Sequence, residues 1–242
     1  MKVALFVPCY IDQFYPQVAK ATLHLLEKLG CTVEYPSNQT CCGQPMANAG
    51  YEYLAEGCAD IFRQCFDRYE YIVSPSGSCV LHVKDHVMPR SNESDGPAVM
   101  ELSEFLTDVM EITSLDASCP YRVGLHNGCH AIRGLGLSSM SEVPGNRFSK
   151  PGSLLRMVNG LELVALDRED ECCGFGGTFS VFEETVSVRM GNDRIDDHIR
   201  HGAQYITGTD MSCLMHLEGL LRRRKCPVRV VHLAEILNDE IH

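Results

Sequence analysis

The sequence predicts an α/β fold built from two pseudo-symmetric, Rossmann-like lobes with mainly parallel sheets. Short apolar runs alternate with helix-length amphipathic segments along the 242 residues, which is the order of elements in a parallel α/β sheet. The motif Cys-Cys-Gly occurs twice, at 41–43 and 172–174, and the two copies are 131 positions apart. The segments 99–106 and 230–237 resemble each other at the same offset. One offset shared by distant segments indicates an internal duplication.

Apolar runs bounded by Gly or Pro predict the strands, and apolar residues at helical spacing predict the helices. In the first half, in chain order, we expect a strand at 3–8, a helix at 18–29 ended by Gly30, a strand at 32–35 closed by Pro36, a helix at 51–69, a strand at 71–73, a helix that begins near Cys79 and carries His82, a surface loop at 90–97 and a helix at 99–111.

The segment 114–121 has the composition of a linker, so we expect one lobe at 1–115 and a second at 120–242. The order of elements then repeats. In the second half, we expect a strand at 122–126, an irregular segment at 135–151, a helix at 154–158, a strand at 161–166, a helical segment at 179–200 interrupted near Gly191, a strand at 205–207, a helix that carries His216, a strand at 228–231 and a helix at 233–237.

Composition excludes several classes of function. The net charge is −11, so we expect neither nucleic acid nor an anionic membrane as a partner, since both require a basic surface. No apolar run approaches the roughly 18 residues of a membrane span, and the N-terminus lacks a signal-peptide pattern, so a cytoplasmic protein is expected. In a reducing compartment, thirteen cysteines favour metal binding or redox chemistry over disulfides.

Eight of the cysteines form two similar sets, and every one of them follows a predicted strand. Because ligands bind beyond the carboxyl ends of parallel strands, we expect each set to form one site. A histidine follows the last cysteine of each set by three positions, on the same helical face, and is a further candidate ligand. The first set is Cys9, Cys41, Cys42 and Cys79 with His82, and the second is Cys129, Cys172, Cys173 and Cys213 with His216.

Adjacent cysteines indicate the kind of site. Neighbouring Cα atoms are about 3.8 Å apart, below the usual range of about 4.4–6.8 Å for a disulfide. Structural zinc usually takes Cys-x-x-Cys knuckles, whereas adjacent thiolates suit a polynuclear centre. The remaining five cysteines are expected to be buried structural thiols, and His126 and His130, which flank Cys129, are weaker candidates for a place at the site. Those five cysteines are Cys31, Cys58, Cys65, Cys119 and Cys226.

This pattern resembles the cysteine-rich CCG domain family, which includes the B subunit of heterodisulfide reductase and iron–sulfur subunits of glycolate and glycerol-3-phosphate oxidation. The chain length and the stretch Cys-Cys-Gly-Phe-Gly-Gly-Thr-Phe-Ser at 172–180 are most similar to its members in L-lactate oxidation. The resemblance implies an iron–sulfur cluster of the [4Fe–4S] type held by the eight cysteines, with zinc open at one site. It also implies a 2-hydroxy acid substrate oxidised to pyruvate and two partners, an iron–sulfur B protein and a C protein.

The chain departs from the family pattern at one position in each site. The full family motif ends in Cys-x-x-Cys, but here both copies end in Cys-x-x-His, at His82 and His216. A five-thiolate cluster of the heterodisulfide-reductase type therefore cannot form unchanged. Two alternatives stay open beside the redox subunit: a thiol–disulfide enzyme, and a zinc-stapled assembly subunit. No flavin or nicotinamide fingerprint is present, and the catalytic residues stay unassigned.

Overall fold

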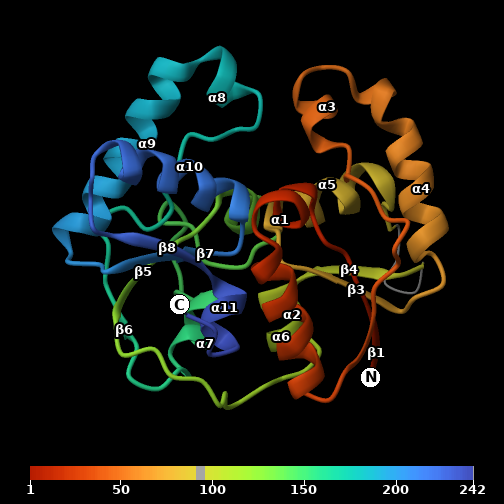
Figure 1. The fold of residues 1–242 in the computed structure, drawn as a ribbon, viewed down its shortest axis with the longest axis horizontal. Coiled ribbons are helices and arrows are strands. Elements are labelled where there is room, and N and C mark those ends of the chain that lie inside the picture. Colours follow the sequence, from red (N-terminus) through yellow and green to blue (C-terminus); the bar gives the residue numbers. More distant parts are fainter. Residues whose placement is uncertain (91–95, 242) are drawn as a thin grey trace.

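The computed structural model describes residues 1–90 and 96–241, and in this part of the chain it contains two four-stranded, parallel sheets (Figure 1). The strand orders are β2-β1-β3-β4 and β6-β5-β7-β8, so the expected α/β class with two similar lobes is confirmed. The first sheet contains β1 (Lys2–Leu5), β2 (Thr32–Glu34), β3 (Tyr71–Ser74) and β4 (Ala98–Glu101), and the second contains β5 (Arg122–His126), β6 (Glu162–Leu163), β7 (Tyr205–Gly208) and β8 (Arg229–His232).

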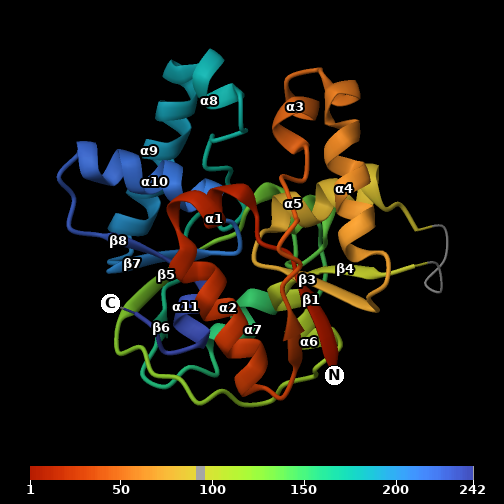
Figure 2. The ribbon, with the colours of Figure 1, turned by 45° about the vertical axis from the view of Figure 1, so that its right-hand side comes forward.

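Helices cover both sheets. The first lobe has α1 (Cys9–Phe14), α2 (Pro16–Lys28), α3 (Gln44–Asn48), the 3-10 turn η1 (Glu52–Ala55), α4 (Glu56–Phe66), α5 (Gly77–His82), the π-helical turn η2 (Val83–Val87) and α6 (Leu102–Asp108). The second has the π-helical turn η3 (His130–Gly134), α7 (Lys150–Leu155), α8 (Phe179–Phe182), α9 (Glu184–Arg200), α10 (Met211–Arg223) and α11 (Leu233–Leu237). Helices α3 and α4 form one prong and α8 and α9 a second, on the same side of the molecule (Figures 1 and 2).

The two lobes share a hydrophobic core. Helix α2 packs against α11, and α6 packs against α7. The two contacts are equivalent in the duplicated fold. Helix α2 of the first lobe has the same place in the element order as α7 of the second, and α6 has the same place as α11. One buried cluster accordingly joins residues of both lobes, such as Leu25 and Phe105 of the first and Leu154 and Ile236 of the second. The lobe boundaries 1–115 and 120–242 stay a prediction, since the packing does not separate the chain there.

The helix expected at 99–111 is wrong in its first turn. Residues Ala98–Glu101 form strand β4, which pairs with β3 in parallel register, and the helix begins only at Leu102. Glu101 starts it with a capping box: its carboxylate accepts from the amides of Ser103 and Glu104, while Glu104 accepts from the amide of Glu101. The repeat contained this signal, because β4 lies 131 positions before β8, whose strand was expected.

The interruption expected near Gly191 is also wrong. Helix α9 runs unbroken through this residue, and the chain bends at Glu183, between α8 and α9. A Cβ atom at Gly191 would lie 2.3 Å from Leu220 Cδ1 and 2.8 Å from His216 Nε2. The glycine is therefore explained by the close approach of α9 to α10 and not by a helix break.

Smaller differences concern the bounds of elements. The helix expected at 51–69 is divided into η1 and α4, the helix expected at 154–158 lies earlier as α7, and the strand expected at 161–166 shortens to β6. Short helices α1 and α3, which we did not expect, follow Pro8 and Gly43. Residues 91–95 of the expected loop at 90–97 lie outside the described residues.

Glu101 gives a test of the β4–α6 junction. Burial raises the pKa of this carboxyl from its ordinary 4.5 to about 8, so the folded state binds more protons than the unfolded state between these values. The stabilising contribution is therefore complete below about pH 4.5 and is lost as the pH rises through about 8. In the wild type, we expect the unfolding free energy to fall by up to about 1.4 kcal/mol per pH unit because of Glu101. Glu101→Gln should lack this fall. Urea unfolding from pH 5 upward measures both.

The matched control is His232, the equivalent position before α11. Burial lowers its pKa from 6.5 to about 4, so the stability it contributes is lost as the pH falls through that range and is constant above it. His232→Gln should leave the slope above about pH 7 unchanged. Parallel stability curves for wild type and Glu101→Gln would contradict the assignment of Glu101.

Candidate metal centre

All eight motif cysteines line a single cleft between the two lobes. The cleft opens to solvent, and its lining brings together two sets of cysteines that the sequence assigned to two separate sites. Each cysteine lies beyond the carboxyl end of a strand, as expected: Cys9 follows β1 and Cys79 follows β3, and Cys129 and Cys213 follow β5 and β7. All thirteen cysteines of the chain are free thiols.

Equivalent turns of the two lobes meet at the centre of the cleft. Ser76 precedes Cys79 by three positions and Asp210 precedes Cys213 by three, and these two residues form an antiparallel bridge with each other. The amide of Gly77 also donates to the carbonyl of Thr209 at 3.1 Å. The approximate twofold relation between the lobes therefore passes through this contact.

Asp210 is the polar residue that joins the turns. Its Oδ2 accepts from the amide of Ser78 at 2.8 Å and from Ser76 Oγ at 3.2 Å, both in the first lobe. Its Oδ1 accepts from the amide of Ser212 at 3.1 Å, which caps α10. One carboxylate thus holds the first turns of α5 and α10, which carry Cys79 and Cys213. The sequence analysis did not identify Asp210, although its position matched that of Ser76.

The thiols of the first site lie within contact of one another. Cys9 Sγ is 3.7 Å from Cys41 Sγ, and Cys42 Sγ is 3.4 Å from Cys79 Sγ. The thiol of Cys9 donates to Cys41, and that of Cys42 donates to Cys79. The neighbouring thiols of Cys42 and Cys9 lower the pKa of Cys41 well below the ordinary value of a thiol. The same hydrogen bonds raise the pKa values of Cys42 and Cys9 above the ordinary value of a thiol. One thiolate is therefore shared among protonated neighbours, and a bound cation would displace these protons.

The second site repeats this arrangement. The thiols of Cys129 and Cys173 donate to Cys172 and lower its pKa to about 2, while the pKa values of the two donors rise. In each site, the amide after the pair also faces a sulfur: Gly43 N is 3.4 Å from Cys41 Sγ, and Gly174 N is 3.4 Å from Cys172 Sγ. Backbone amides that donate to sulfur stabilise its negative charge.

The glycine of each Cys-Cys-Gly motif has no room for a side chain. Gly43 and Gly174 have φ values of +92° and +84°, which favour glycine. A Cβ atom at Gly43 would lie 2.9 Å from Ala55 Cβ, and one at Gly174 would lie 2.7 Å from Met190 Cβ and 2.8 Å from the carbonyl oxygen of Ser187. The glycine lets the backbone after the cysteine pair pack directly against η1 in the first site and against α9 in the second, so the two sites have the same backbone design.

His82 and His216 lie behind the cysteine pairs and do not line the cleft. The His82 ring stacks on His86 with centroids 4.9 Å apart. His216 Nε2 is 3.4 Å from both the carbonyl oxygen and the Oγ of Ser187. Burial lowers the pKa of both histidines. His82 and His216 therefore pack behind the cysteine pairs and outside the cleft, whereas His130 lines the cleft.

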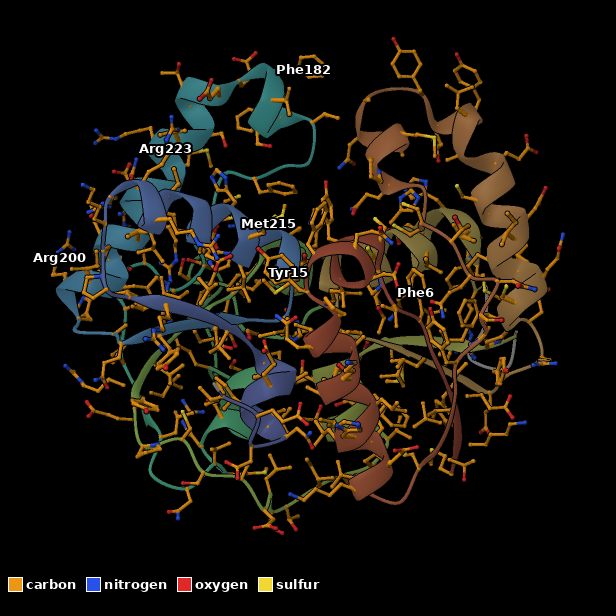
Figure 3. All side chains as sticks on the ribbon, in the orientation of Figure 1. Phe6, Tyr15, Phe182, Arg200, Met215 and Arg223 are labelled. Carbon is orange, nitrogen blue, oxygen red and sulfur yellow. The ribbon has the colours of Figure 1, made fainter. Side chains whose placement is uncertain are left out.

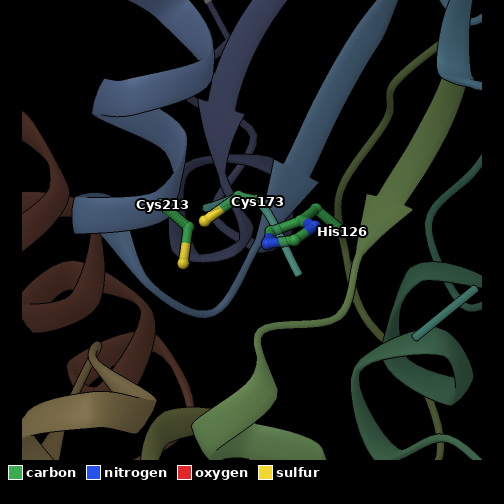
Figure 4. A group of neighbouring side chains, drawn as sticks. All are labelled: His126, Cys173 and Cys213. Carbon is green, nitrogen blue, oxygen red and sulfur yellow. The ribbon is translucent and has the colours of Figure 1, made fainter. Parts of the chain in front are cut away.

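His126, a weaker candidate from the sequence, lies at the second site. Its ligand nitrogen and the sulfur atoms of Cys173 and Cys213 all lie within 4.8 Å of one another. Figure 4 shows the three side chains next to one another, and they come from β5, the loop after β6 and the first turn of α10. Burial, and next the charge of Arg194, lower its pKa to about 3, so the ring is the neutral form that binds metals.

The five other cysteines lie away from the cleft, but the expectation that they are buried holds only for Cys31 and Cys119, since Cys58, Cys65 and Cys226 are half-buried. Cys31 and Cys119 are buried in the shared core, and Cys65 packs against the core of the first lobe. None of the helices in the described part of the chain is long and apolar enough to cross a membrane.

Comparison with known proteins extends over the whole chain. The chain matches the cysteine-rich domain family, CCG, over residues 3–84 and 123–218. It is 40% identical to lactate utilization protein A of Exiguobacterium sp. (strain ATCC BAA-1283 / AT1b), over 99% of this chain and 98% of that protein. It is 41% identical to lactate utilization protein A of Geobacillus kaustophilus (strain HTA426), over 98% of this chain and 99% of that protein. Among solved structures, a glutamate racemase from Thermus thermophilus aligns with 99% of this chain and 77% of its own chain, with a TM-score of 0.36 and 12% sequence identity.

The crowding around Gly174 gives a test of the shared backbone design. Gly174→Ala combines an unfavourable positive φ with contacts below 3 Å to Met190 and Ser187, and we expect it to lower the unfolding free energy by about 2–5 kcal/mol. Gly50→Ala is the matched control, since Gly50 has a φ of +81° with no atom within 4 Å of the added Cβ, and it should cost only about 1–2 kcal/mol. Equal losses in urea unfolding would show that crowding at the cysteine pair is unimportant.

Proposed function

This chain belongs to the cysteine-rich CCG domain family, and on that premise we propose that it is an iron–sulfur redox subunit of a multi-protein system that oxidises L-lactate to pyruvate. The observation that carries the proposal is the single cleft lined by all eight motif cysteines. The relatives named lactate utilization protein A, which match it over nearly their full length, support the substrate. We place the protein in the cytoplasm, where its free thiols stay reduced.

The residues of the cleft fit an iron–sulfur group. We assign the ligands to Cys9, Cys41, Cys42 and Cys79 in the first site and to Cys129, Cys172, Cys173 and Cys213 in the second. Thiolate sulfur is the preferred ligand of such clusters, and the amides of Gly43 and Gly174 face the sulfurs. A cluster of the [4Fe–4S] type would supply one-electron transfer when bound. His82 and His216 hold the backbone behind each pair in this assignment.

The lining of the cleft favours electron transfer over direct binding of the hydroxy acid. Among the described residues that line it, none is Lys or Arg, and the one carboxylate, Asp210, accepts four hydrogen bonds from the serine turns. A carboxylate substrate such as lactate is bound most strongly by a cationic side chain. We therefore place oxidation of the 2-hydroxy acid on another subunit, from which electrons enter the cleft.

The two prongs beside the cleft suit the docking of partner proteins. Gln44 and Asn48 of α3 line one wall, and Gly176 and Gly177 before α8 line the other. Large apolar side chains are exposed further out: Phe182 is 76% exposed and Tyr53 is 70% exposed. Figure 3 shows Phe182 at the outer end of the second prong. Exposed aromatic residues next to a functional cleft are typical of protein interfaces. We assign this surface to the iron–sulfur B protein and the C protein.

Zinc at the second site is the alternative cofactor, and one observation favours it. His126, Cys173 and Cys213 offer nitrogen and sulfur together, which is a donor set that zinc also accepts. In that case the first site alone would carry electrons. Metal analysis separates the two assignments, because zinc gives no redox signal and no acid-labile sulfide.

The thiolate assignment predicts how iron content responds to substitution. Protein purified and reconstituted without oxygen should contain iron and sulfide and give an EPR signal on reduction. We expect Cys41→Ser or Cys172→Ser to remove about half of the iron, because each substitution disables one of two thiolate sites. Cys226→Ser is the control, since Cys226 lies outside the cleft, and it should retain all of the iron. Wild-type protein without iron after reconstitution would contradict the proposal.

The substrate assignment predicts a growth phenotype. Deletion of the gene should abolish growth on L-lactate but leave growth on glycolate and on glycerol-3-phosphate unchanged. A copy with Cys226→Ser should restore growth on L-lactate, and a copy with Cys172→Ser should fail to do so. Growth of the deletion strain on L-lactate at the wild-type rate would exclude this substrate.

A further inference from the structure

The second site holds a buried histidine whose ring has no protein partner. His126 ends strand β5 and is 2% exposed. Neither ring nitrogen has a hydrogen-bond partner among the described residues. A buried polar group left without a partner destabilises the folded state, because it has lost its hydrogen bonds to water. Such an arrangement is stable when the group binds something that offsets this cost.

The surroundings of His126 show what it faces. Its ligand nitrogen and the sulfurs of Cys173 and Cys213 lie within 4.8 Å of one another. Arg194 and His198 of α9, both fully buried, also lie close to the ring. Arg194 Nη1 pairs with Asp197 at 3.1 Å, while Nε and Nη2 of Arg194 and both ring nitrogens of His198 have no hydrogen-bond partner among the described residues. The metal-binding atoms grouped with the His126 ring are therefore the sulfurs of Cys173 and Cys213 (Figure 4).

The first lobe is different at the equivalent positions. Phe6 precedes Cys9 by three positions, as His126 precedes Cys129. The two residues also hold equivalent positions beside the neighbouring central strand, β3 for Phe6 and β7 for His126. Phe6 packs on Phe62 and Phe66 of α4, with ring centroids 5.0 and 5.8 Å apart. Phe62 and Phe66 correspond to Arg194 and His198 at a common offset of 132. The lobes therefore keep the same thiolates but replace three phenylalanines by His, Arg and His.

We propose that His126 is a nitrogen ligand of the metal centre at the second site, beside Cys173 and Cys213. The inference rests on the proposed function in one respect, namely that the second site binds a metal, and it holds for iron as for zinc. The two sites then have different donor sets, thiolates in the first and thiolates with an imidazole in the second. Because imidazole ligands raise the reduction potential of an iron–sulfur centre relative to thiolates, the duplicated sites are not equivalent in electron transfer.

The test is X-ray absorption of the full-length protein at the edge of the metal it retains. In a Cys41→Ser/Cys42→Ser background, only the second site contributes to the spectrum. We expect imidazole scattering in this background and its loss on His126→Phe, which reproduces the first lobe. His126→Gln, which keeps a polar side chain, should also remove the signal. Affinity measured by chelator competition should fall by about ten-fold or more in both variants.

The controls separate a ligand from a structural residue. His216→Gln and His130→Gln remove the other imidazoles near the second site, and the metal that each variant binds should still show the imidazole scattering assigned to His126. In wild type with histidine labelled by ¹⁵N, pulsed EPR of a paramagnetic centre should show one nitrogen coupling that disappears in His126→Gln. Bound metal with sulfur scattering alone, or imidazole scattering that survives in both His126 variants, would overturn the inference. Failure of wild type to bind any metal would instead contradict the proposed function, and the inference with it.

Discussion

The carboxylate of Asp210 holds the two lobes together where the two thiolate sites meet. It accepts from Ser76 and Ser78 of one lobe while it caps the helix that carries Cys213 in the other. The helix turns behind Cys79 and Cys213 are therefore fixed to each other and not only to their own sheets. This contact joins the two sheet edges at which the thiolate sites lie, at the centre of the cleft.

The helical layer beneath the sheets supports the same arrangement. Helix α2 packs against α11 and α6 against α7, and the cluster they form includes residues of both sheets. Burial of this apolar surface is the larger contribution to stability, at about 25 cal/mol for each Å² removed from water, whereas the polar contacts at Asp210 determine register. The cleft is the other end of this interface, so the core that joins the lobes also sets the position of the cysteines.

Duplication has preserved the backbone of the sites and changed their surroundings. Gly43 and Gly174 have the same left-handed conformation, and both are crowded by a neighbouring helical segment, η1 in the first lobe and α9 in the second. The layer behind them is aromatic in the first lobe, at Phe6, Phe62 and Phe66, and polar in the second. A hydrophobic layer is the less costly solution for a core, so the polar layer is better explained by function than by folding.

The sequence by itself determined the α/β class, the duplication and the eight cysteines at strand ends, because these follow from local periodicity and from spacing along the chain. It also contained the correct strand at 98–101, since the repeat offset placed it there, although local helical periodicity of the following residues concealed it. Gly191 was misread for a similar reason: its packing partners, Leu220 and His216, are distant in sequence.

Only the tertiary structure decided that the two sites share one cleft and that His126 belongs to the second. Spacing shows at which end of a sheet a loop lies, but not how two sheets are placed relative to each other. That placement comes from long-range packing of α2 on α11 and from Asp210. The place of His126 likewise depends on α9, whose fully buried Arg194 and His198 lie close to the ring. Contacts between residues far apart in the chain leave no periodic signal, and for this reason the sequence could indicate the ligands but not their assembly.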